Sequence, residues 1–195
     1  MLLHNKKIKA DPADIKDEYA LYLVLTQTGT RVSRLIKFYT RAPFNHVSVS
    51  SDERLANMFS FARQNAPKLF PAGFTKENIT DGVFGMYASV PCVIYKIPVT
   101  REQYMRFNNL INKFDNNKKL YKYNLFGFVT MIFNIPIKPK HSFMCSQFVA
   151  YILQEAGIIN FNKRLSLVKP DDFRHMDNLQ LIYSGDIKEY AEVYA

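Results

Sequence analysis

The segment SFMCSQFVAYILQEAG, residues 142–157, predicts an amphipathic helix that carries a cysteine in its first turn. Its apolar residues recur at intervals of three and four, which indicates one face packed against a core. Ser142 is expected to cap the helix and Gly157 to end it. The expected core-facing residues are Met144, Phe148, Val149, Ile152, Leu153 and Ala156. A helix of this kind needs a second layer to cover its apolar face.

The cysteine of this segment has two interpretations. With Ser142 as the cap, Cys145 is the third residue of the helix, where unpaired backbone N–H groups and the positive end of the helix dipole favour a thiolate. The thiolate is the reactive form of cysteine, so the position suits a nucleophile. The alternative is a small buried residue on an amphipathic helix. Cys92 lies in the alternating apolar segment SVPCVIYKI and is expected to be structural.

The second layer is predicted by strand patterns in the first half of the chain. The segment NHVSVSS alternates with a period of two residues, as a strand with one buried face does. Val47 and Val49 point to one side, while His46 lies with the small Ser48 and Ser50 on the other. Small neighbours leave room in front of an imidazole. His46 is therefore the best-placed candidate for a catalytic base.

The other histidines suit this role less well. His4 lies in the polar N-terminal segment and His175 in a polar loop, while His141 lies on the proline-rich approach to the helix. His141 and Cys145 share the i, i+4 spacing of helical metal ligands, but no third ligand is near them and neither C-x-x-C nor H-E-x-x-H occurs. No metal and no cofactor are expected.

A catalytic base needs a third polar group that orients its ring. If the residues DER form a three-residue connection, Ser51 pairs with Leu55 and His46 faces Ser60 on the returning strand LANMFSFAR. A connection one residue shorter brings Asn57 toward His46 instead. Ser60 and Asn57 are thus the two candidates for the orienting residue.

The remaining segments complete an order of strands followed by helices. YALYLVLTQ predicts a strand and residues 28–40 a short helix, while QNAPKLFPAGFTKEN, with two prolines and a glycine, predicts a long loop. GVFGMYASVPCVIYKIPV predicts two strands. Thr100 and Gln103 form a capping box at the start of a helix, and LYKYNLFGFVTMIF predicts another helix. After the cysteine helix, only loop and one short strand in LQLIYSG are expected. The predicted fold class is α+β, with an antiparallel sheet packed against the cysteine-bearing helix.

The composition is that of a folded, basic protein. The chain has 195 residues, of which 48% are hydrophobic and 14% aromatic, enough for a sizeable core. A polar leader is expected for residues 1–18 and a single domain for residues 19–195. The net charge of +9 favours anionic partners. The positive residues are dispersed and show no spacing typical of a nucleic-acid-binding motif, so nucleic acid is not expected as a partner of the active protein.

The sequence also bears on location. The N-terminal segment lacks the order of charged, apolar and small residues that a signal peptide has, and no apolar run approaches the roughly 20 residues of a membrane helix. With two cysteines, a disulfide framework is not expected. A cytoplasmic protein with reduced thiols is predicted.

Several of these segments together resemble a known family. PFNHVSVS, then NMFSFAR with AGF in the following loop, and much later FMCSQFVAYIL, resemble the circularly permuted NlpC-type papain-like proteins, a group that includes the YiiX-like proteins. The lecithin–retinol acyltransferases are more distant relatives. In the permuted group the histidine strand precedes the cysteine helix, as it does here. The resemblance covers residues 19–172 and implies a permuted papain-like fold.

The resemblance also implies a function. His46 would be the general base and Cys145 the nucleophile, with Ser60 or Asn57 as the orienting residue. Such a site implies a thiol hydrolase (amidase or peptidase) or an acyltransferase, which forms an acyl-enzyme with an amide or ester substrate.

The expected partners are an amide- or ester-containing small molecule, peptide or lipid. An anionic membrane surface is a further expected partner. The basic surface and an aromatic loop around Phe70 and Phe74 would suit an anionic amphiphile as the substrate. The alternative is a catalytically inactive papain-like domain that binds an anionic lipid, peptide or nucleic acid. The sequence does not indicate the oligomeric state.

Overall fold

The computed structural model describes residues 19–29, 42–63, 72–137 and 140–194. Within these ranges eight strands form one sheet in the order β7-β6-β4-β3-β2-β1-β5-β8. Neighbouring strands are antiparallel, except for the parallel pair β6 and β7. The strands are β1 (Ala20–Thr26), β2 (His46–Ser50), β3 (Met58–Arg63), β4 (Ala72–Glu77), β5 (Pro91–Pro98), β6 (Lys122–Tyr123), β7 (Ser142–Phe143) and β8 (Gln180–Asp186).

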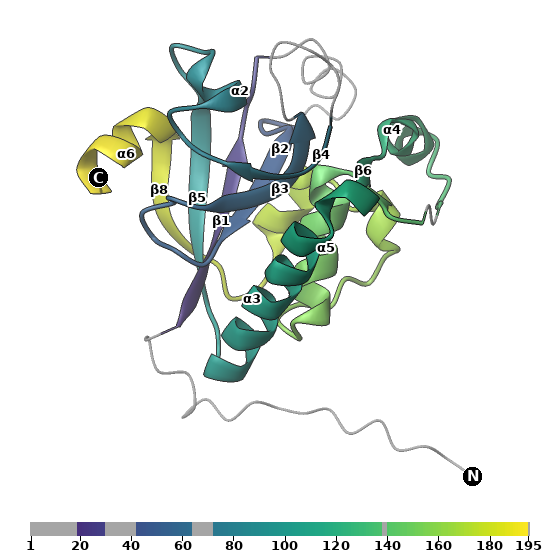
Figure 1. Cartoon of the computed structure of the whole chain (residues 1–195). Coiled ribbons are helices and arrows are strands. Elements are labelled where there is room, and N and C mark those ends of the chain that lie inside the picture. Colours follow the sequence, from purple (N-terminus) through teal and green to yellow (C-terminus); the bar gives the residue numbers. More distant parts are fainter. Residues whose placement is uncertain (1–18, 30–41, 64–71, 138–139, 195) are drawn as a thin grey trace.

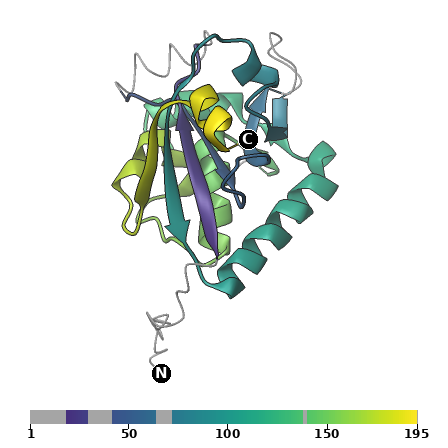
Figure 2. The ribbon, with the colours of Figure 1, turned by 90° about the vertical axis from the view of Figure 1, so that its left-hand side faces the viewer.

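Helices lie against both faces of this sheet (Figure 1). They are α2 (Gly82–Gly85), α3 (Arg101–Asn116), α4 (Leu125–Ile132), α5 (Cys145–Glu155) and α6 (Ile187–Tyr194). Short 3-10 helices follow α3 and α5, at Lys118–Leu120, Leu165–Leu167 and Pro170–His175. Helices α3 and α5 contribute to one hydrophobic cluster, and α2 and α6 to a second. Figure 2 shows β1, β5 and β8 running side by side, with α6 packed at the end of this part of the sheet. The mixed α+β class is confirmed.

The larger cluster is built around aromatic rings. Phe61 of β3 lies 5.1 Å from Phe148 of α5 and 6.1 Å from Phe114 of α3, measured between ring centroids. Phe74 of β4 lies 5.6 Å from Phe148. Tilted and edge-on rings at such distances add a favourable quadrupole interaction to the burial of their surface. These contacts fix α5 against the strands that carry the candidate site.

Helix α3 is present with its predicted cap, and helix α5 with its predicted buried face and its predicted end. Thr100 caps α3 by accepting a hydrogen bond from the Gln103 N–H, and the Gln103 side chain accepts one from the Thr100 N–H. This is the predicted capping box. The six apolar residues predicted to face the core from the cysteine helix are all buried. Gly157 directly follows the C-cap of this helix with a φ of 74°, a conformation that glycine adopts without a steric penalty.

Three predictions of secondary structure are wrong. The segment predicted as a long loop contains β4 between Ala72 and Glu77. The first of the two strands predicted before and after Pro91 is instead the short helix α2. The C-terminal part, predicted as loop with one strand, contains the 3-10 helices and α6 as well as β8. The loop prediction matters most, because β4 carries a residue of the candidate site.

Some predictions concern residues outside the described ranges. These are the polar leader at residues 1–18, most of the short helix at residues 28–40, and Phe70 of the predicted aromatic loop. Phe74, the other aromatic residue of that loop, is buried in the core on β4, so it does not belong to a loop that could contact an amphiphile. Among the helices of the described part, none is long and apolar enough to cross a membrane.

Candidate active site

The candidate nucleophile is the first residue of α5. The N-cap is Met144, and Ser142, which was predicted to be the cap, belongs to β7. Cys145 therefore lies at the start of the first turn and not at its third position. Its backbone N–H is one of the first four of the helix, which have no partner within the helix. The residue is buried, with 7% of its surface exposed, and it belongs to the larger hydrophobic cluster.

His46, at the start of β2, contacts this cysteine. The His46 ring and the Cys145 side chain form a hydrogen bond. Strand β2 pairs with β1 through a register that sets His46 opposite Thr26. The preceding residue, Asn45, is tied to β1 as well, since its N–H donates a hydrogen bond to the Thr26 carbonyl at 3.1 Å. The imidazole is thus held by a rigid part of the sheet.

The third member of the site is Glu77, the last residue of β4. Its Oε1 and Oε2 lie 2.9 and 3.1 Å from His46 Nε2. The Ser48 hydroxyl donates a hydrogen bond to Glu77 Oε2 and lies 3.3 Å from the same ring nitrogen. The side chains of His46 and Glu77 are both largely buried. A buried carboxylate that accepts hydrogen bonds from both a ring and a hydroxyl group fixes the orientation of the ring.

Neither predicted orienting residue contacts His46. Val49 pairs with Phe59, whereas the predicted connection would set it opposite Asn57, so the register prediction is wrong by two residues. The buried Ser60 hydroxyl donates its hydrogen bond to the Val47 carbonyl at 2.8 Å. Among the described residues, no hydrogen bond joins Asn57 to His46. The hydrogen bonds that orient His46 come from Glu77.

Glu77 was missed because of its local sequence. Pro67, Pro71 and Gly73 in the same segment favour a loop. The signal that could have found it is the run from Ala72 to Glu77, which is long enough for a strand and has Phe74 on one face and Glu77 on the other. An acidic residue on the second strand after a candidate histidine is a better orienting group than a serine.

The charges of the site favour a protonated ring. Burial lowers the pKa of His46, because a charged ring loses hydration. The Glu77 carboxylate and the hydrogen bond with Cys145 outweigh burial and raise the pKa of His46 from 6.5 to about 10. At neutral pH His46 is therefore an imidazolium between a carboxylate and a sulfur atom. Such a cation stabilises negative charge on the sulfur.

Tyr123 lies near the sulfur, and Arg63 lies near Tyr123. Burial and the charge of Cys145 raise the pKa of Tyr123, while the charge of Arg63 lowers it. Tyr123 belongs to β6, and Arg63 is the last residue of β3. Both were absent from the sequence prediction, since neither lies in a pattern that distinguishes it from core or surface.

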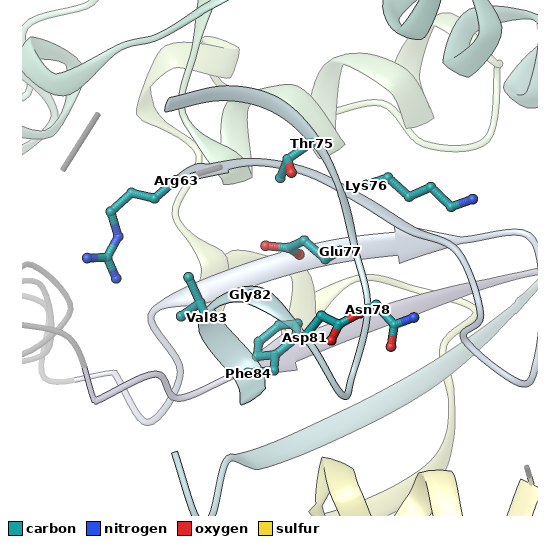
Figure 3. Close-up of a pocket in the computed structure, with 9 residues that line it drawn as sticks. All are labelled: Arg63, Thr75, Lys76, Glu77, Asn78, Asp81, Gly82, Val83 and Phe84. Carbon is teal, nitrogen blue, oxygen red and sulfur yellow. The ribbon is translucent and has the colours of Figure 1, made fainter. Parts of the chain in front are cut away.

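Beside the His46–Glu77 pair there is a pocket of about 220 Å³ (Figure 3). In this view the Glu77 carboxylate lies near Val83 and Phe84 of α2, and the Lys76 side chain extends away from it. The His46 and Phe84 rings are 6.3 Å apart. The pocket is lined by Arg63, Thr75, Lys76, Glu77, Asn78, Asp81, Gly82, Val83 and Phe84.

The remaining histidines and the second cysteine lie elsewhere. The His141 ring is 5.6 Å from the Tyr121 ring, and His175 lies 3.7 Å from an Asp171 oxygen. Cys92 is buried in the second cluster, where burial raises the pKa of its thiol to about 12. Within the described ranges, no three His, Cys, Asp or Glu side chains gather as a metal site. His4 lies outside these ranges.

The raised pKa of His46 predicts a pH dependence that Glu77→Gln should remove. The substitution keeps the side-chain length but removes the negative charge, so the pKa of His46 should fall from about 10 toward its ordinary 6.5. Titration of the His46 ring resonances by NMR measures this shift directly. Glu102→Gln, which alters an exposed carboxylate paired with Arg106, is the matched control and should leave the midpoint unchanged.

The same shift affects stability. The pKa of His46 is higher in the folded state than in the unfolded state, so protonation of this ring stabilises the folded protein. Its contribution to the free energy of unfolding is fully present below pH 6.5 and is lost as pH rises through about 10. The free energy of unfolding of the native protein, measured with urea, should fall over this range by a few kcal/mol more than that of Glu77→Gln. Parallel curves for the two proteins would contradict the pairing of His46 with Glu77.

Comparisons of this chain with protein-family models, with curated proteins and with solved structures found no match.

Proposed function

We propose that this protein is a thiol hydrolase or acyltransferase that acts on an amide or ester through an acyl-enzyme. One observation carries the proposal. Cys145 at the start of α5 is hydrogen-bonded to His46, and His46 is hydrogen-bonded to Glu77. A nucleophile, a base and a residue that orients the base, in contact and in that order, form the arrangement used in covalent acyl transfer.

The proposed reaction begins from the ion pair. The Cys145 thiolate attacks the carbonyl carbon, a C–S bond forms, and the carbonyl oxygen becomes negatively charged. The His46 imidazolium gives its proton to the leaving amine or alcohol as the C–N or C–O bond breaks. Neutral His46 then takes a proton from water or from an acceptor alcohol or amine, which attacks the thioester. The product leaves, and the thiolate–imidazolium pair is restored.

The start of α5 offers a donor for the negatively charged oxygen. The Cys145 N–H belongs to the first turn, where the helix dipole is positive. A donor at this position is suited to a developing oxyanion, since it needs no reorganisation during the reaction. The Glu77 carboxylate keeps the imidazolium oriented and compensates its charge, so it is a positioning residue.

The order of the elements supports a permuted papain-like fold within the α+β class. A histidine at the start of a strand precedes a cysteine at the start of a helix, and that helix packs on the sheet that carries the histidine. The substrate class we propose is an amide or ester of a small molecule, peptide or lipid. We also propose a cytoplasmic location, because both thiols are free, as in a reducing compartment.

Alkylation by iodoacetamide tests the ion pair without knowledge of the substrate. An ordinary thiol loses about a hundredfold in reactivity between pH 8.5 and pH 6, because its thiolate fraction falls. The rate at Cys145 should instead change by less than about threefold over this range. Peptide mass spectrometry after timed labelling measures the rate at each cysteine separately.

Cys92 is the internal control for this experiment. Burial raises the pKa of its thiol to about 12, so it should react only when the protein is unfolded in urea, where both cysteines should label alike. If both cysteines label slowly in the native protein, and with the steep pH dependence of an ordinary thiol, the chain would instead be a papain-like domain that binds an anionic ligand without catalysis.

A further inference from the structure

Helix α4 exposes the apolar side chains that a helix normally buries. Phe126, Val129 and Phe133 follow one another at intervals of three and four, so they lie on one side of the helix and its C-terminal end. The first and last of them are 80% and 68% exposed. The opposite side, with Gly127 and Met131, is the buried one. The apolar face toward water is therefore not covered by the residues that the structure describes.

This helix is part of an excursion that projects from the fold at its side (Figure 1). The chain leaves the sheet after β6 and returns at β7, and these two strands pair with each other. The Lys122 N–H donates to the His141 carbonyl at 2.8 Å, and the Asn124 N–H donates to the Phe143 carbonyl at 2.9 Å. The two ends of the excursion are thus fixed side by side, which holds the apolar tip in one position.

The base of the excursion is basic. Lys122 and Lys140 flank its two ends, and Lys118 and Lys119 precede it in the 3-10 helix after α3. All four lysines are exposed. The acidic residue nearest to them in sequence, Asp115, lies 3.5 Å from Lys118. The excursion therefore combines an apolar tip with a positively charged base.

We propose that this excursion docks the protein on an anionic lipid membrane. Aromatic and aliphatic side chains at the tip enter the boundary between headgroups and acyl chains, while the lysines at the base contact lipid phosphates. Charge complementarity selects this partner, because a protein surface that covers only the apolar tip would leave the lysines without anions. The net charge of +9 adds long-range attraction to the same surface.

The proposal concerns binding alone and does not depend on the proposed chemistry. Helix α4 has eight residues, so it lies at the surface of the bilayer and does not span it.

Vesicle sedimentation tests the proposal with the full chain. Phosphatidylcholine vesicles in which about one lipid in three is phosphatidylserine should bind the protein. Vesicles of pure phosphatidylcholine should bind it at least about tenfold less well. The double variant Phe126→Ser/Phe133→Ser should lose at least about tenfold in affinity, because two exposed aromatic rings no longer enter the interface. Lys119→Gln/Lys122→Gln should lose a similar factor, and only on anionic vesicles.

A matched control is available on the opposite side of the protein. Leu181 of β8 and Val193 of α6 are exposed apolar residues far along the sheet from α4, and Leu181→Ser/Val193→Ser should bind vesicles as the native protein does. Equal loss in this control, or equal binding to neutral and anionic vesicles, would overturn the proposal. An absence of vesicle binding would also overturn it. This includes the case in which light scattering shows a dimer that Phe126→Ser/Phe133→Ser converts to a monomer.

Discussion

His46→Ala is expected to slow the alkylation of Cys145 at pH 6 by about a hundredfold. In the proposed ion pair, the imidazolium of His46, which Glu77 holds in place, stabilises negative charge on the sulfur. Without it the cysteine behaves as an ordinary thiol, of which about 0.3% is thiolate at pH 6. The difference in labelling rate between the native protein and His46→Ala should shrink above pH 9, where an ordinary thiol is ionised as well. Timed labelling with iodoacetamide and mass spectrometry gives both rates.

His141→Ala is the matched control for this variant. His141 precedes Cys145 by only four residues, but its ring packs edge-on against that of Tyr121 and the residue is exposed. Its removal should change the labelling rate less than twofold if proximity in sequence plays no part. A large effect of His141→Ala and none of His46→Ala would reverse the assignment of the base.

Phe61→Ala should lower the free energy of unfolding by about 3–5 kcal/mol. Phe61 is fully buried, and its ring lies 5.1 Å from that of Phe148 and 5.3 Å from that of Phe143. The substitution removes the contact between β3 and the cysteine helix and leaves a cavity, so it should also loosen the site. Urea denaturation measures the loss.

Phe126→Ala provides the comparison, because it removes the same ring from an exposed position. It should change stability by less than about 0.5 kcal/mol. If Phe61→Ala does not fold, Phe61→Leu should still fold with a smaller loss of about 1–2 kcal/mol. A loss for Phe61→Leu no greater than that for Phe126→Ala would contradict the role assigned to the aromatic cluster.

The sequence predicted those features that depend on local periodicity. The two-residue alternation of the strand placed Val47 and Val49 on the face opposite to His46, and both valines are in the core. Helical spacing identified the buried face of α5. Because the period of a strand is two residues, the error of two in the register of β2 and β3 left the faces unchanged. The proximity of His46 and Cys145, expected from the family resemblance, is present in the structure.

The features that the sequence did not predict depend on pairing between distant segments. Strand β4 is held by its ladder with β3, from Met58 opposite Glu77 to Arg63 opposite Ala72, and its own residues signal a strand only weakly. The helix N-cap was assigned to Ser142 by side-chain preference, but pairing of Ser142 with Lys122 makes it part of β7 and delays the helix to Cys145. In both cases tertiary context overrides local propensity.

The two halves of the site differ in how close their segments lie along the chain. Strands β2, β3 and β4 are consecutive neighbours in the sheet, so His46 and Glu77 can meet as soon as this local meander forms. The sulfur comes from a segment about 100 residues after His46 and requires long-range closure, which is intrinsically slower. A partly folded chain in which this closure has not occurred therefore lacks the imidazolium beside its thiol.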